Sequence, residues 1–167
     1  MLFTDQDEPA TFSPCRVWRY RLARRWAKGL SAAFILLNPS TADETNDDPT
    51  IRRCIAYAKR WGYGGLVLGN IFALRSTDPK GLYSHADPVG PDNDAALGSI
   101  AKEADRIVCG WGTHGVFQNR SEAVLRIIRE AGAEPLALKL TAAGHPGHPL
   151  YLRQDLLPLP MPATERN

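Results

Sequence analysis

Short apolar runs alternate along this chain with longer segments in which apolar residues recur every three or four positions. Residues 32–37 and 66–68 are continuous apolar runs, a pattern typical of strands buried on both faces of a parallel sheet. Residues 106–111 and 134–140 predict two further strands. Residues 17–26 mix aromatic, apolar and arginine side chains at a spacing near two, which predicts an additional early strand.

Three of the intervening segments predict helices. Asp47 or Asp48 is the candidate N-cap of the first helix, and Pro49 suits its first turn. Residues 94–104 and 121–131 predict the other two helices. Because strands and helices alternate, we expect an α/β protein: a three-layer sandwich around a central, mainly parallel four-stranded sheet.

Length and composition narrow the class of protein. The 167 residues suit one domain, and we expect a single α/β domain over residues 1–157 followed by a loose Pro-rich tail over 158–167. No apolar run is long enough to cross a bilayer, and the acidic residues 1–8 lack the basic-then-apolar plan of a secretory signal. We therefore expect a cytoplasmic, monomeric enzyme or binding protein with no membrane partner.

The small net charge of +2 conceals two basic clusters, at residues 16–28 and 52–60. Acidic residues concentrate instead in residues 43–48. Nucleic-acid-binding proteins are usually more basic overall. Local basic patches can still bind a phosphate backbone, so the charge pattern permits a DNA or RNA partner without requiring one.

Unusual polar sequences follow four of the predicted strands: Asn38-Pro39-Ser40, Gly69-Asn70, Gly112-Thr113-His114 and the two His-Pro pairs of residues 145–149. Each is also explained as an ordinary turn or cap when taken alone. Ligands of parallel α/β sheets bind at the carboxyl ends of the strands, where these segments should converge on one rim. Their convergence, rather than any single residue, predicts a site.

Metal and nucleotide chemistry have weaker support. His145 and His148 with Asp47 or Asp48 could supply metal ligands, but the proline after each histidine favours extended backbone and does not bring the rings together. The chain contains no Walker A or Gly-x-Ser-x-Gly sequence. The three widely spaced cysteines form no Cys-x-x-Cys pair and are expected to be buried, inert thiols. We therefore expect neither a metal nor a nucleotide cofactor.

Four blocks, residues 36–43, 48–53, 70–75 and 148–152, resemble a bacterial and phage family known as domain of unknown function family 1643. The order of the motifs is also similar to that of the uracil-DNA glycosylase superfamily. Residues 37–40 resemble the Asn-Pro first loop of its mismatch-directed branch, and Asn70 ends a strand as does its base-reading Asn. The motifs Trp111-Gly112-Thr113-His114 and His145-Pro146-Gly147-His148-Pro149-Leu150 resemble its Trp-Gly-Ser-His and His-Pro-Ser-Pro-Leu sequences.

The resemblance implies a uracil-DNA glycosylase-like fold and hydrolysis of an N-glycosidic bond in DNA. In that mechanism Asn38 positions the water and stabilises the sugar cation, Asn70 pairs with the base edge, and His148 or His145 donates to a base carbonyl. The remaining implied contacts are Ser40, Asp43 and Phe72 with the base, Arg52, Arg53 and Arg75 with phosphates, and Leu150 and Tyr151 in the vacated base stack.

Two departures from the superfamily pattern shape the expected substrate. Asn38 cannot act as a general base, so catalysis should be slower than with Asp. Ser40 replaces the bulky ring of uracil-specific members, which leaves room for a 5-substituted pyrimidine whose hydroxyl groups could be bound by the acidic residues 43–48. The expected role is excision of such a base in repair or anti-phage defence. A metal-assisted nucleotide hydrolase or transferase and a non-catalytic binder of modified DNA are the alternatives.

Overall fold

The strand β3 (Ser31–Leu36) lies at the centre of the sheet in the computed structural model, which describes residues 8–162. Its side chains alternate between two faces, as the period of a strand requires. Ala33 and Ile35 belong to one hydrophobic cluster, while Phe34 and Leu36 belong to another. A strand that is apolar on both faces must be covered twice, and this creates the three layers of the fold.

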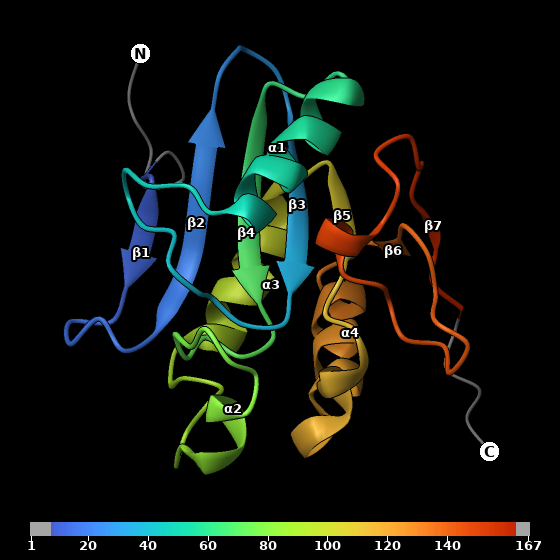
Figure 1. The fold of residues 1–167 in the computed structure, drawn as a ribbon. Coiled ribbons are helices and arrows are strands. Elements are labelled where there is room, and N and C mark those ends of the chain that lie inside the picture. Colours follow the sequence, from blue (N-terminus) through green and yellow to red (C-terminus); the bar gives the residue numbers. More distant parts are fainter. Residues whose placement is uncertain (1–7, 163–167) are drawn as a thin grey trace.

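Within residues 8–162, seven strands form a mixed sheet in the order β1-β2-β4-β3-β5-β6-β7 (Figure 1). The four strands from β4 to β6 in this order run parallel, whereas β1, β2 and β7 add antiparallel pairs at the two edges. The α/β class and the parallel core are therefore confirmed. The further strand bounds are β1 Ala10–Phe12, β2 Arg19–Arg25, β4 Gly65–Asn70, β5 Arg106–Cys109, β6 Pro135–Ala137 and β7 Leu159–Pro160.

The predicted number of strands is wrong. The prediction of four strands counts only the parallel core of the seven-stranded sheet. The strands β1 and β7 have three and two residues, too few for hydrophobic periodicity to detect. β7 lies in the segment expected to be a loose tail, where it pairs with β6. Residues 1–7, which carry most of the acidic start, and residues 163–167 of the tail lie outside the described part of the chain.

The helix α1 (Pro49–Arg60) covers one face of the sheet, and α3 (Asn93–Glu103) and α4 (Arg120–Glu130) cover the other (Figure 1). The Asp48 side chain accepts a hydrogen bond from Ile51 N at 2.9 Å, so Asp48 is the N-cap of α1. Shorter helical segments lie in the loops: α2 Gly81–Ser84, η2 Thr113–Asn119 and η3 Pro149–Tyr151.

No helix in residues 8–162 combines the length and the apolar character that a membrane span needs.

The order of the parallel strands determines where a ligand can bind. From β3 the chain passes through α1 to β4 on one side, and from β4 it crosses through α3 to β5 on the other side of β3. The connections that leave β3 and β5 therefore diverge in opposite directions. Open α/β sheets bind ligands at such switch points, outside the carboxyl ends of the strands.

Replacing Phe34 with Ala tests the core beneath α1. The Phe34 side chain is fully buried and stacks on Trp61, with ring centroids 5.8 Å apart. We expect its truncation to lower the free energy of unfolding by about 3–5 kcal/mol, measured by urea denaturation. Leu30→Ala, at a position 62% exposed, is the control and should change stability by less than about 0.5 kcal/mol. Equal losses in both variants would contradict this packing.

Candidate functional site

The loops that follow the parallel strands meet at one edge of the sheet, as the sequence predicts. Leu36 at the end of β3 pairs with Asn70 at the end of β4, and β5 ends beside them at Cys109. The Gly112 backbone N–H donates to Pro146 O at 2.8 Å, which joins the loop after β5 to the segment after β6. We call this edge the rim.

Gly110 fixes how closely the second His-Pro pair approaches the rim. A Cβ atom at this position would lie 2.9 Å from Pro149 Cδ and 3.0 Å from Leu36 Cδ2. Both distances are too short for a side chain, so only glycine fits here without displacing a neighbour. The backbone around His148 consequently packs directly against the ends of β3 and β5.

The Asn38 amide has a defined orientation. Its Nδ2 donates to Ser76 O at 2.8 Å and to Pro39 O at 3.1 Å. Two carbonyl acceptors around one amide nitrogen leave Oδ1 as the group available for an outside donor. Asn38 is half-buried, so it can present this acceptor to a water molecule at the rim.

The His148 ring is also held in one orientation. Its Nδ1 accepts a hydrogen bond from Leu150 N at 3.2 Å, which closes the first turn of η3. Because a backbone N–H can only donate, the proton of the neutral ring must be on Nε2. Burial lowers the pKa of His148 below its ordinary 6.5, opposed by the Asp48 carboxylate. At neutral pH, His148 is therefore an uncharged Nε2–H donor.

The structure distinguishes the two candidate histidines. The backbone of His145 closes a tight turn with Thr141, in which Thr141 N donates to His145 O at 2.8 Å and His145 N donates to Thr141 Oγ1 at 3.1 Å. Within residues 8–162, no side-chain hydrogen bond holds the His145 ring. The fixed ring at the rim is that of His148.

Asn70 lies almost completely inside the protein, with 2% of its surface exposed. Its Oδ1 accepts from Arg19 Nη2 at 3.4 Å, while its Nδ2 has no hydrogen-bond partner within residues 8–162. Arg19 is equally buried, and it also donates to Ala42 O at 3.0 Å. Arg19 thus holds the Asn70 amide through its oxygen, and the amide nitrogen is left as a donor.

Arg19 is the residue that sequence reasoning missed. In the sequence it stands among the N-terminal basic residues, and its neighbour Arg21 shares the same alternating pattern. Burial lowers the pKa of Arg19 to about 10, opposed by Asp48, and its guanidinium remains charged at neutral pH. The alternating pattern of residues 17–26 predicts that some of these arginines face the interior. The alternation alone does not show on which face of the sheet Arg19 lies.

A family model described as a protein of unknown function, DUF1643, matches residues 19–150. The chain belongs to this family. Comparisons with curated proteins and with solved structures find no match. The family match runs from the start of β2 to Leu150 within η3, and therefore includes all four loops at the rim.

The acidic residues 43–48 of this DUF1643 chain are engaged within their own loop. Thr45 N and Asn46 N donate to Asp43, and these hydrogen bonds lower its pKa to about 2. Glu44 pairs with Arg16 at 2.7 Å, and Asp47 pairs with Arg24 at 2.8 Å. Asp48 is the N-cap already described. The loop carboxylates therefore stabilise the loop itself, which weakens the prediction that they bind a substituent of a base.

The other predicted site residues differ in accessibility. Phe72 is fully buried and packs on Phe117, so it belongs to the core rather than to the surface of the rim. Ser40 is half-buried beside Asn38 in the sequence. Leu150 is half-buried, whereas Tyr151 has 83% of its surface exposed.

The predicted phosphate contacts and His114 make protein contacts of their own. Arg52 donates to Asp47 O at 3.2 Å, Arg53 donates to Leu152 O at 3.2 Å, and Arg75 lies over the Phe12 ring. His114 Nδ1 is 2.7 Å from the hydroxyl of Tyr83, on α2. His114 therefore belongs to a separate aromatic contact with α2.

The metal ligands considered from the sequence were His145 and His148 with Asp47 or Asp48, and the structure does not group them as a metal site. Among the described residues, no group of three or more His, Cys, Asp or Glu side chains is arranged to hold a metal ion. Cys54 and Cys109 are buried thiols, and burial raises their pKa values. Cys15 is exposed, which corrects the expectation that all three cysteines are buried.

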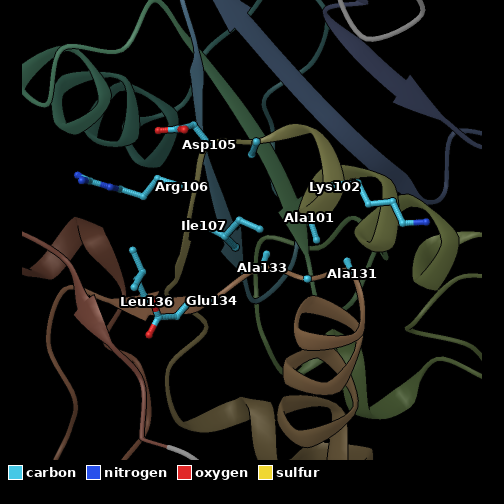
Figure 2. A pocket seen from close by; sticks show the side chains of 11 residues that line it. Ala101, Lys102, Asp105, Arg106, Ile107, Ala131, Ala133, Glu134 and Leu136 are labelled. Atoms are coloured by element: carbon cyan, nitrogen blue, oxygen red, sulfur yellow. The ribbon is translucent and has the colours of Figure 1, made fainter.

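A cavity of about 360 Å³ lies at the opposite edge of the sheet from the rim (Figure 2). It is bordered by the starts of β5 and β6 and by the ends of α3 and α4, and Lys102, Arg106 and Glu134 are among its charged lining residues. None of the site residues predicted from the sequence lines this cavity. The cavity and the rim are therefore separate features.

The lowered pKa of His148 makes a prediction about stability. The unfolded chain binds a proton near pH 6.5 and the folded chain only at lower pH, so the free energy of unfolding should fall as pH drops below about 6.5. Urea denaturation across about pH 5–8 measures this dependence. His148→Gln should remove this histidine's part of the slope. An unchanged slope in the variant would contradict a buried, neutral His148.

Proposed function

We propose that this DUF1643 protein is a monofunctional DNA glycosylase that removes a modified, 5-substituted pyrimidine from DNA by hydrolysis. The observation that carries the proposal is the fixed His148 ring, whose Nδ1 accepts from Leu150 N and whose Nε2–H is a neutral donor. At the same rim Asn38 offers an acceptor and Asn70 offers a donor. These are the groups needed to hold a water, a base edge and a base carbonyl.

The chemistry follows from these three groups. When the bond between the sugar carbon and the base nitrogen breaks, its electron pair leaves with the base, and negative charge develops on the base carbonyl oxygen. The Nε2–H of His148 donates to this oxygen, where a preorganised donor is most effective. The Oδ1 of Asn38 orients a water whose oxygen bonds to the sugar carbon. That water loses its proton to solvent, since an amide cannot accept it.

The surface next to His148 suits a DNA partner. Tyr151 projects from η3 beside the histidine, with ring centroids 5.5 Å apart, and can fill the space of a flipped base. A hollow of about 150 Å³ nearby is lined by Arg53 and Arg60 of α1 together with Gln154. Two arginines beside a stacking side chain provide phosphate contacts of the kind that position a duplex.

Asn38→Ala tests the catalytic role of the rim. The variant loses the water-orienting acceptor, so the single-turnover rate of base release should fall by on the order of a hundredfold or more. Release is measured as alkali-labile sites in duplexes that carry 5-hydroxymethyluracil, 5-hydroxymethylcytosine or glucosylated 5-hydroxymethylcytosine. Binding to the same duplexes should persist, because the phosphate contacts remain.

The matched control is Asn46→Ala, which removes an exposed amide from the same loop and should preserve most of the activity. Unchanged release by Asn38→Ala would exclude Asn38 from the mechanism. Binding without release by the wild-type protein would indicate a non-catalytic reader of modified DNA.

Ser40→Tyr tests the proposed preference for substituted bases. A ring at this position should fill the space beside pyrimidine carbon 5, so release of 5-hydroxymethyluracil should fall more than release of uracil. Competition between the two duplexes gives the ratio of kcat/KM values, which we expect to shift toward uracil by about tenfold or more. An unchanged ratio would show that Ser40 does not border the substituent.

A further inference from the structure

A bulge in β2 places the Arg19 side chain beneath the rim. Thr11 of β1 pairs with Arg21, but Phe12 pairs with Arg19, so Tyr20 is an extra residue in β2. Such a bulge reverses the normal alternation and re-aims side chains. Arg21 reaches Glu103 of α3 on one face of the sheet, whereas Arg19 contacts the loop after β3 on the other.

The charge of Arg19 is buried without a carboxylate in contact. Only 2% of the residue is exposed, its Nε is buried with no partner, and within residues 8–162 its hydrogen bonds go to two neutral oxygens. Arg120 shows the usual arrangement in this fold, since it is buried but pairs with Asp94 at 2.8 Å. A buried cation that is not paired with a carboxylate is unfavourable, which indicates that Arg19 serves something other than stability.

Charged groups of both signs lie near Arg19. The Asp48 carboxylate raises the pKa of Arg19, whereas Arg75 and Arg24 lower it, and Arg24 is itself paired with Asp47. The Asp48 side chain is occupied as the N-cap of α1. The bonded acceptor, Asn70 Oδ1, belongs to the residue expected to meet the base edge.

We propose that Arg19 is a positioning residue that holds the Asn70 amide with its nitrogen toward the base and stabilises the negative charge of the departing base. This inference rests on the proposed glycosylase function. Arg19 acts through Asn70 and through its field, and it does not touch the reacting atoms. The fixed Asn70 nitrogen and the buried cation would both favour the anionic form of the base.

The test compares two leaving groups. Duplexes with 5-hydroxymethyluracil or with the more acidic, better-leaving 5-fluorouracil are cleaved in single-turnover assays by wild type, Arg19→Met and Arg19→Lys. Arg19→Met should slow release of 5-hydroxymethyluracil by on the order of a hundredfold and release of 5-fluorouracil by clearly less. Arg19→Lys keeps the charge and should restore most of the wild-type ratio between the two rates.

Arg24→Met is the matched control, because Arg24 lies on the same strand and bonds the same loop through Asp43 O, but pairs with Asp47. It should lower both rates by a similar factor, and thermal unfolding of every variant reports whether it is folded. Two results would overturn the role of Arg19 and leave the proposed function standing. One is an equal fall in the release rates of both bases in Arg19→Met. The other is a ratio of the two rates in Arg19→Lys that is no closer to wild type than the ratio in Arg19→Met. Failure of the wild type to release either base would overturn the proposed function as well.

Discussion

The structure depends on the burial of β3 on both faces between two parallel neighbours. Residues 31–36 contribute to both hydrophobic clusters and pair with β4 on one side and β5 on the other. Because the three strands are parallel, their carboxyl ends lie at one edge, and chemically useful side chains in distant parts of the sequence are brought together there. Pro149 packs closely against Gly110, which brings the His-Pro segment after β6 to the same edge.

Local patterns in the sequence predicted the elements of the parallel core and narrowed the N-cap of α1 to Asp47 or Asp48. Those features depend on neighbours along the chain, where apolar period and capping chemistry act directly. The edge strands β1 and β7 are too short to have a period, and their pairing depends on tertiary contacts. The position of Arg19 could not be predicted for a related reason, since one extra residue in β2 changes which face it meets.

The hydrogen bonds at the rim, more than the residue types there, determine which side-chain donors and acceptors are available to a ligand. The sequence offered two histidines and several acidic residues as alternatives. The backbone N–H of Leu150 donates to Nδ1 of His148, so the ring proton is on Nε2. Ser76 O accepts from Nδ2 of Asn38, which leaves Oδ1 of Asn38 free. The carboxylates of residues 43–48 instead hold their own loop and the start of α1. Polar residues can be located from sequence, but their free donors and acceptors depend on the folded backbone.

The proposed glycosylase function leads to one direct measurement. Mass spectrometry of the products formed by the wild-type protein on a duplex with a single 5-hydroxymethylpyrimidine identifies which bond breaks. The account predicts release of the free modified base and a strand of unchanged length with an abasic site. Release of a nucleoside or nucleotide, or recovery of the intact duplex across the series of modified pyrimidines, would contradict it.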